Sequence, residues 1–452
     1  MQAVPGSLNK RATAAAAALE QVQAGHWEGR LAAASGRATE ILGLARHLSL
    51  GDRISIHGRR DLSTIAEIIA VRGDLVHAMT FSPIDGLGVG APASAPMGAC
   101  SSGLAVSDGW LGRVVDPLGR LLDGGVPTAG GRRLRPVRVP PPEATRRARL
   151  GERMSLGVRA LDLFATCRHG QRIGLFAGSG VGKSTLLAML ANNVACDLSV
   201  IALVGERGRE VREFLEDDLG VAGLARSVVV VATSDASPLM RREAAYAAMT
   251  VAEHFRDRGE KVLLLMDSVT RFCHALREIA LAAGDPPASR GYPPSVFAEL
   301  PRLLERAGPG VQSTTSAGQI TGFFTVLVDG DDHNEPIADS VRGLLDGHVV
   351  LDRRIAERGR LPAVDVARSL SRAAPGCNAP TENELAVRAR QILATYADVS
   401  DLVRLGAYRP GADAAVDEAL VLAPRIEAVL RQRRGERTEL TDAFLQLELA
   451  MR

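Results

Sequence analysis

The glycine-rich segment 177–185 has the residue types and the spacing that bind phosphate. Glycines let backbone N–H groups close around an anion without a Cβ clash, and a helix that begins here adds the positive end of its dipole. The Lys183 ammonium can then reach the β- and γ-phosphates of a nucleotide, and the Ser184 hydroxyl can ligate Mg²⁺. We predict that the phosphate-binding residues are Gly178, Ser179, Gly180, Val181, Gly182, Lys183, Ser184 and Thr185.

One position departs from the usual phosphate-loop pattern GxxxxGK[ST], because Ala177 stands in place of the first glycine. The flanking pattern still has the order that such a loop requires. An apolar segment typical of a strand precedes the loop, and a helical pattern follows it. We therefore keep the prediction of nucleotide binding.

Two carboxylates, Glu206 and Asp267, stand just after apolar segments that predict strands. In open α/β sheets, ligands bind at the carboxyl ends of the strands. Asp267 can hold the Mg²⁺ shell there, and Glu206 can orient and polarise the attacking water. Arg207 can stabilise charge on the γ-phosphate. By spacing alone, however, the charged run 205–213 is more typical of a solvated surface.

These side chains need a scaffold, and from Gly170 onward apolar strand-like segments alternate with amphipathic helical patterns. Such alternation is typical of an α/β fold with a parallel sheet covered on both faces. We expect strands at 172–177, 198–204, 227–232, 262–266, 322–328 and 348–351, and the main helices at 185–193 and 239–258.

The regions before and after this α/β segment have different sequence patterns. Short strand-like segments between residues 27 and 96 predict a small β-barrel or sandwich, with strands at 53–57, 66–71 and 75–81. Residues 8–24 predict an alanine-rich helix with little apolar bulk, which either frays or docks on a partner. After Pro380 only helical patterns remain, at 382–396, 413–432 and 440–451. The expected domains are an N-terminal helix (1–24), a β-barrel (25–96), a P-loop domain (97–378) and a helical C-terminal domain (379–452).

Composition excludes several classes of protein. The 54 Lys and Arg residues nearly balance 52 Asp and Glu, so the chain has no global basic footprint for nucleic acid. Its five cysteines lack CxxC spacing, which disfavours a disulfide framework or a zinc site and fits a reducing cytosol. We find neither an apolar run long enough for a bilayer nor a signal-peptide pattern, and we expect a cytoplasmic protein.

Longer motifs resemble a known family over nearly the whole chain from about residue 30. Segments around the phosphate loop and the two carboxylates resemble the rotary ATPases: 174–185, 205–210 and 265–272. Three further segments resemble the type III protein export ATPases, the motors of flagellar assembly and of virulence injectisomes: 290–308, 331–339 and 345–350. The export branch also resembles this sequence at Ala177.

The resemblance implies a RecA-like P-loop ATPase core with an N-terminal β-barrel and a helical C-terminal domain. It implies a homohexamer that binds ATP and Mg²⁺ at subunit interfaces, with Ser184 and Asp267 on the metal side. By position, Glu206 matches the catalytic glutamate, Arg207 the γ-phosphate arginine, and Arg372 the arginine finger of the neighbouring subunit.

One position departs from the family pattern at the adenine. Leu361 stands where the family usually has a tyrosine that stacks on the base. We expect other apolar side chains to share this contact, with Tyr408 as the candidate, and base selectivity is open.

The resemblance also implies partners: a regulatory stator-like export protein at the N-terminal helix, a central stalk-like export protein, an export gate at the inner membrane, and chaperone–substrate complexes. Segments 326–336, 166–167 and 357–360 look more like flagellar members than injectisome members. The alternatives are an injectisome ATPase, a rotary synthase subunit, and an RNA-translocating hexamer. The last would need a basic, aromatic-rich barrel, whereas this one has Trp27 and Phe81 and no basic cluster.

Overall fold

The computed structural model describes residues 25–59, 62–97, 103–125, 133–178, 180–311, 318–328, 332 and 335–452. The expected N-terminal helix (1–24) and Ser179 of the phosphate loop lie outside the described residues. The chain divides into two compact units, one made of Met1–Gly103 and Ile279–Asp285 and the other of Leu104–Glu278 and Pro286–Arg452. Within the described residues, no helix has both the length and the apolar character needed to cross a bilayer.

The first unit contains a closed six-stranded antiparallel barrel. Side chains alternate between its interior and the solvent, so that Ile54 and Ile56 are buried while Ser55 is only half-buried. This period of two, with Gly and Pro between the segments, accounts for a barrel rather than helices. In spatial order the strands are β1 (His26–Ser35), β2 (Ala38–Leu42), β5 (Leu75–Thr80), β4 (Ser63–Arg72), β3 (Arg53–His57) and β6 (Pro92–Pro96).

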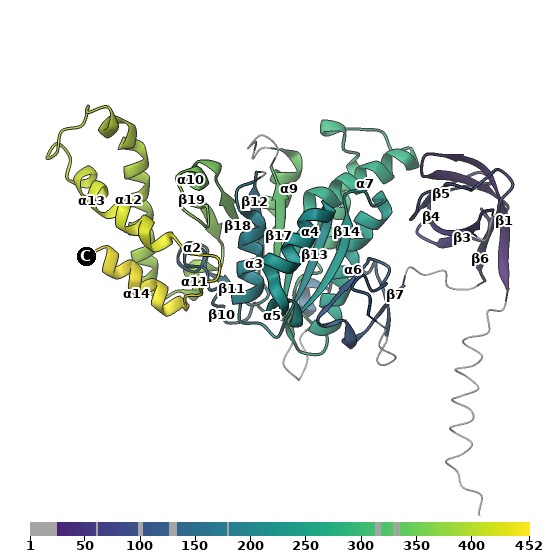
Figure 1. Cartoon of the computed structure of the whole chain (residues 1–452), viewed down its shortest axis with the longest axis horizontal. Coiled ribbons are helices and arrows are strands. Elements are labelled where there is room, and N and C mark those ends of the chain that lie inside the picture. Colours follow the sequence, from purple (N-terminus) through teal and green to yellow (C-terminus); the bar gives the residue numbers. More distant parts are fainter. Residues whose placement is uncertain are drawn as a thin grey trace, which may run out of the picture. The chain divides into compact units, whose positions relative to one another are not determined.

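A nine-stranded sheet forms the centre of the second unit (Figure 1). Its middle strands pair in parallel and are buried on both faces, as their continuous apolar sequences predict. In spatial order the strands are β19 (Val364–Ser371), β18 (Gly347–Leu351), β12 (Arg172–Ala177), β17 (Gln319–Leu327), β15 (Lys261–Asp267), β13 (Leu198–Glu206), β14 (Ser227–Thr233) and β8 (Arg113–Val115). Two pairs are antiparallel: β19 with β18, and the short β16 (Gly308–Pro309) with β17.

Each face of this sheet has its own hydrophobic cluster. Leu175 and Phe176 are neighbours on β12 and point into different clusters, as the alternation of a strand requires. The first face packs against α2 (Arg159–Phe164), α3 (Lys183–Asn193), α4 (Gly208–Glu213) and the π-helix η3 (Phe214–Leu219). The second packs against α6 (Pro238–Arg256), α7 (Val269–Ala283), α8 (Pro294–Leu304) and α9 (Pro336–Leu344).

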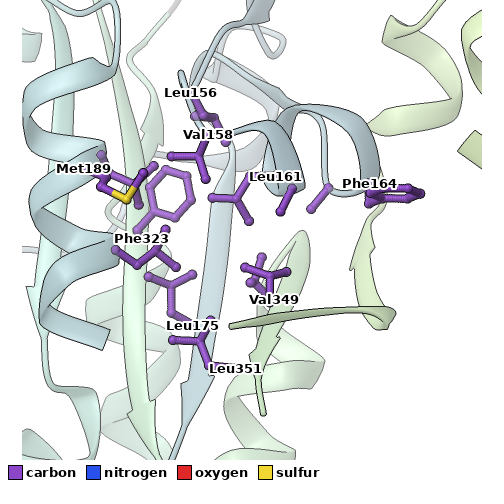
Figure 2. Packing of buried hydrophobic residues seen from close by; sticks show 14 of the residues in the cluster. Leu156, Val158, Leu161, Phe164, Leu175, Met189, Phe323, Val349 and Leu351 are labelled. Carbon is purple, nitrogen blue, oxygen red and sulfur yellow. The ribbon is translucent and has the colours of Figure 1, made fainter. Parts of the chain in front are cut away.

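The helical C-terminal region shares the first of these clusters. Ile426 and Phe444 belong to the same apolar cluster as Phe164 of α2 and Leu186 of α3. Figure 2 shows part of this cluster, where side chains of the segment before α2 and of α2 itself meet those of β12, β17, β18 and α3. The region consists of α12 (Pro380–Arg404), α13 (Ala414–Leu430) and α14 (Leu440–Ala450).

Short elements connect these layers. They include the two-stranded pairs β7 (Gly103–Val106) with β9 (Arg133–Pro136) and β10 (Arg153–Met154) with β11 (Cys167–Arg168). They also include the helices α5 (Gly220–Ala225), α10 (Arg353–Glu357) and α11 (Ala374–Cys377).

Candidate active site

The phosphate loop joins the end of β12 to the first residue of α3, which is Lys183. Gly180 and Gly182 adopt left-handed φ values of 77° and 88°, which favour glycine. A Cβ built on Gly180 would meet no atom, so backbone conformation rather than space explains the glycine there. Val181 is buried, whereas Ser184 at the start of the helix is exposed. The loop thus has the strand, turn and helix order that the motif predicts.

Three of the predicted residues come together beside this loop. The Lys183 ammonium donates to Asp267 Oδ1 at 2.6 Å and to Glu206 Oε1 at 3.4 Å. Glu206 and Asp267 are the last residues of β13 and β15, which are neighbouring parallel strands. All three side chains are at most 14% exposed. The sheet therefore assembles one cation and two carboxylates from distant parts of the sequence.

Burial changes the acid–base behaviour of this group. Burial and the nearby Asp267 charge raise the pKa of Glu206 to about 7, although Lys183 opposes the shift. Burial disfavours the charge of Lys183, but the Asp267 and Glu206 carboxylates outweigh it and raise the pKa of this amine. A carboxyl with a pKa near neutrality is suited to accept a proton at physiological pH.

The oxygen donors near the loop fit a magnesium ion. Thr325 on β17 donates its hydroxyl to Asp267 Oδ1 at 2.6 Å and so fixes the orientation of this carboxylate. Asp267 and the exposed Ser184 hydroxyl offer the carboxylate and hydroxyl oxygens that Mg²⁺ prefers. Both residues were predicted on the metal side.

A further arginine, Arg271, lies beside Gly205, the neighbour of Glu206, and was missed by sequence reasoning. A Cβ on Gly205, which has a φ of 71°, would lie 3.1 Å from the Cβ of Arg271. The Arg271 Nε is buried, and no hydrogen-bond partner for it occurs among the described residues. The signal was present, since Arg271 lies only four residues after Asp267, at the start of α7.

The two other predicted arginines lie elsewhere. The Arg207 side chain is 81% exposed and pairs with Glu210 at 3.2 Å, so in this conformation it faces solvent. Arg372 follows β19 and is exposed, and its backbone N–H donates to the carbonyl of Asp346. Because β19 is antiparallel to β18, this places Arg372 at the edge where β12 begins. The phosphate loop lies at the other end of β12, about 20 Å away along the strand.

A cavity of about 330 Å³ adjoins the phosphate loop and the first turns of α3. Its size and largely apolar lining suit a nucleobase. Leu361 is 48% exposed on its wall, consistent with its predicted place beside the base. The lining residues are Gly182, Thr185, Leu186, Met189, Gly359, Leu361, Pro362, Arg431, Gln432, Arg433 and Arg434.

Tyr408 does not line this cavity. It lies between α12 and α13, where its hydroxyl donates to Asp417 Oδ1 at 2.9 Å and lies 3.0 Å from the carbonyl of Asp413. These contacts anchor the tyrosine to the start of α13. The segment Arg431–Arg434 lines this cavity instead of Tyr408, and sequence reasoning missed this segment.

Arg159 holds that segment in place. It is 6% exposed, at the start of α2, and its Nε donates to the carbonyl of Val429 at 2.6 Å. Its remaining donors bond to the carbonyl of Arg431, the carboxylate of Glu436, the hydroxyl of Thr438 and, from the backbone N–H, the amide oxygen of Gln432. The wall of the cavity therefore depends on one buried guanidinium.

Comparisons with known proteins agree with this architecture. The model of the ATP synthase alpha/beta family, nucleotide-binding domain, matches residues 157–371, and that of the T3SS EscN ATPase C-terminal domain matches 379–448. The flagellum-specific ATP synthase of Caulobacter vibrioides is 50% identical over 431 residues, which cover 95% of this chain and 96% of that protein. The chain belongs to the type III export ATPase family. The type 3 secretion system ATPase of Xanthomonas euvesicatoria is 45% identical to this ATPase over 419 residues, covering 91% of the chain and 90% of the relative.

Solved structures of the family have the same fold as this ATPase. The assembled ATPase EscN from the enteropathogenic E. coli type III secretion system matches with a TM-score of 0.86 and 38% identity, over 94% of this chain and all of that one. EscN in complex with its central stalk EscO matches with a TM-score of 0.84 and 37% identity over the same shares. The comparison confirms the predicted RecA-like core, N-terminal barrel and C-terminal helices.

Proposed function

We propose that this ATPase is the motor of a type III protein export apparatus of the flagellar kind, which couples ATP hydrolysis to chaperone release and export. The observation that carries the catalytic part is the Lys183 ammonium held between Glu206 and Asp267 beside the phosphate loop. The flagellar assignment is supported by the 50% identity to a flagellum-specific ATP synthase over 95% of the chain.

The residues divide the chemistry among themselves. When the phosphates of ATP enter the loop, Lys183 turns from the two carboxylates to the β- and γ-oxygens. Glu206, released from that ion pair, orients the attacking water and accepts its proton. Ser184 and Asp267 would hold Mg²⁺, which supplies charge neutralisation at the phosphates when bound. We assign Arg271, whose buried Nε has no hydrogen-bond partner among the described residues, and the exposed Arg207 to the same γ-phosphate charge.

The arginine finger requires a second copy of the chain. Arg372 lies at the opposite end of β12 from its own phosphate loop, so it cannot reach its own γ-phosphate. In a homohexamer with ATP at the subunit interfaces, Arg372 would instead complete the neighbour's site. A cation supplied in this way stabilises the transition state only in the assembled ring.

The test is the ATPase rate per subunit measured against protein concentration. The wild-type rate should rise steeply as rings form, whereas Arg372→Ala should stay about a thousandfold below the assembled rate at all concentrations. Arg368→Ala is the matched control, because Arg368 lies on β19, the strand that Arg372 follows, and pairs with Asp352 at 3.7 Å. A rise in rate that survives Arg372→Ala would remove Arg372 from this role.

The partners are proposals of the same kind. A regulatory stator-like protein would bind residues 1–24, and deleting them should abolish that binding while leaving basal hydrolysis intact. The complex of EscN with its central stalk EscO supports a stalk-like partner for this ATPase. Chaperone–substrate complexes and the inner-membrane export gate complete the set, so the ATPase would work in the cytoplasm and associate with the membrane peripherally. We assign it no nucleic acid.

An injectisome ATPase is the second candidate, because a type 3 secretion system ATPase is 45% identical over 91% of the chain. Deleting the gene distinguishes the two functions. Loss of flagellar filaments with unchanged secretion of other proteins is expected. Intact filaments in the deletion strain would establish the injectisome alternative.

A further inference from the structure

The cavity beside the phosphate loop determines which base the ATPase accepts. Gly182 and Thr185 belong both to the loop and to the cavity wall, so a nucleotide whose phosphates contact Lys183 places its base there. Opposite α3, the wall consists of Leu361 with Pro362 and of the segment Arg431–Arg434. Discrimination between purines depends on the polar groups that these residues direct to the base edge.

The side-chain amide on this wall, that of Gln432, has both of its donors in use. Gln432 is 3% exposed, and its Nε2 donates to the carbonyls of Gly157 and Glu436, both at 2.8 Å. Its Oε1 accepts the backbone N–H of Arg159 at 2.9 Å. Amide side chains read adenine by pairing with N6 and N7. Both N–H donors of the Gln432 amide are used within the protein, so it cannot make this paired contact.

The three arginines that line the cavity, Arg431, Arg433 and Arg434, differ in whether their guanidinium groups have partners. The Arg434 guanidinium is held by Asp218 at 2.6 Å. Arg431 and Arg433 are exposed, and among the described residues neither guanidinium has a hydrogen-bonded partner, although Arg433 is near the charge of Glu436. These two side chains are therefore available to a base in the cavity.

Guanidinium groups donate hydrogen bonds and accept none. Guanine offers two acceptors, O6 and N7, on the edge where adenine offers N7 and the donor N6. Arginine therefore serves guanine at least as well as adenine, and a guanidinium plane stacks on the face of either base. Leu361 supplies an apolar contact that is indifferent to the base.

We propose that the base cavity is purine-tolerant, so that the protein hydrolyses GTP nearly as well as ATP, with Arg431 and Arg433 as the base-contacting residues. The proposal rests on the proposed hydrolysis. The water oxygen bonds to the γ-phosphorus, the bond to the bridging oxygen breaks, GDP leaves, and Glu206 takes the water proton. The γ-phosphate chemistry is the same for both nucleotides.

The test compares kcat/KM for ATP and GTP in the assembled full-length protein. We expect the two values to agree within about tenfold, because a site without committed edge contacts discriminates weakly. Arg433→Gln and Arg431→Gln add an acceptor that can pair with adenine N6, so each should raise the ATP to GTP ratio several-fold. Arg437→Gln is the matched control, since Arg437 pairs with Glu439 at 2.9 Å and does not line the cavity.

The outcomes separate this proposal from the proposed function. A preference of the wild type for ATP above about a hundredfold, with normal ATP hydrolysis, would overturn base tolerance alone. Unchanged KM values for both nucleotides in Arg431→Gln and Arg433→Gln would overturn the assignment of these residues. Absence of hydrolysis of either nucleotide by the assembled protein would overturn the proposed function and this inference with it.

Discussion

The two ends of the nucleotide site are built differently. At the phosphate end, the side chains of Lys183, Glu206 and Asp267 are 12%, 14% and 5% exposed and are paired with one another. At the base end, Leu361 is 48% exposed, and Arg431 is exposed with no hydrogen bond from its side chain to a described residue. Chemistry at phosphorus needs charges fixed in advance, whereas holding a base needs only surface and planar groups.

Replacing Glu206, the proposed proton acceptor at the phosphate end, should have the largest effect on the rate of hydrolysis. Glu206→Gln keeps the shape of the side chain but removes its ability to accept a proton. We expect kcat for ATP to fall by about 10² to 10⁴, with nucleotide affinity retained. Single-turnover hydrolysis and equilibrium binding measure the two quantities. Glu213→Gln serves as the control because Glu213 is 48% exposed and pairs with Arg209. Near-normal turnover of Glu206→Gln would show that another group activates the water.

Loosening the wall of the nucleobase cavity should lower the affinity for nucleotide and leave the catalytic rate nearly unchanged. Arg159→Ala removes the guanidinium that holds residues 429–438 and leaves their carbonyls without that donor. We expect KM for ATP to rise about tenfold or more while kcat in saturating ATP changes little, with a loss of unfolding free energy of about 3 kcal/mol. Arg159→Lys should not restore KM, because an ammonium lacks the planar fork. A fall in kcat at unchanged KM would contradict the expectation that the nucleobase end governs affinity and the phosphate end governs rate.

The pH dependence of kcat/KM follows from the raised pKa of Glu206. Below about pH 7 the carboxyl is protonated and cannot act as a base, so kcat/KM should fall about tenfold per pH unit on acidification. Glu206→Gln should remove this limb from the profile. Since the native pKa lies above that of the unfolded chain, the native state binds more protons between about pH 4.5 and 7. This contribution to stability is present at low pH and is lost as the pH rises through 7, which thermal unfolding of the two proteins can measure.

The smallest effect is expected at Tyr408. Tyr408→Phe removes hydrogen bonds to Asp413 and Asp417 but leaves the base cavity unchanged. We expect KM for ATP and GTP to stay within a factor of two and the unfolding free energy to fall only slightly. A severalfold rise in KM would indicate that Tyr408 contacts the nucleobase.

Much of the fold could be predicted because apolar residues recur at regular strand or helix spacing along many of its segments. Strands 53–57 and 172–177 were predicted at the bounds that the structure shows, and the P-loop helix begins two residues earlier than expected. The edge strand β19 was missed because its sequence VDVARSLS mixes buried and exposed positions irregularly. β1 was missed because HWEGRLAAAS carries little β-branched character.

The site could be predicted where one local motif contains the residues and not where it depends on distant contacts. Glu206 and Asp267 stand at strand ends, and Lys183 stands at the start of the helix after the glycine-rich loop, and the sequence pattern marks all three positions. Arg159 and Gln432 are 273 positions apart, and no period connects them. The local hint was the two charged residues, Arg159 and Asp162, inside the otherwise apolar segment 156–164, since buried charged side chains must find partners.

The ion pair between Arg434 and Asp218 has a wider consequence. Asp218 lies on η3, which follows α4 and the strand that ends in Glu206, while Arg434 follows the C-terminal helix α13. This ion pair thus connects the segment after β13 with the segment after α13 at the wall of the cavity. By thermodynamic reciprocity, if a ligand of the C-terminal helices and a nucleotide both favour the conformation that holds this ion pair, each tightens the binding of the other by the same factor. The affinity of such a ligand and the affinity for nucleotide are then two measures of one coupling free energy.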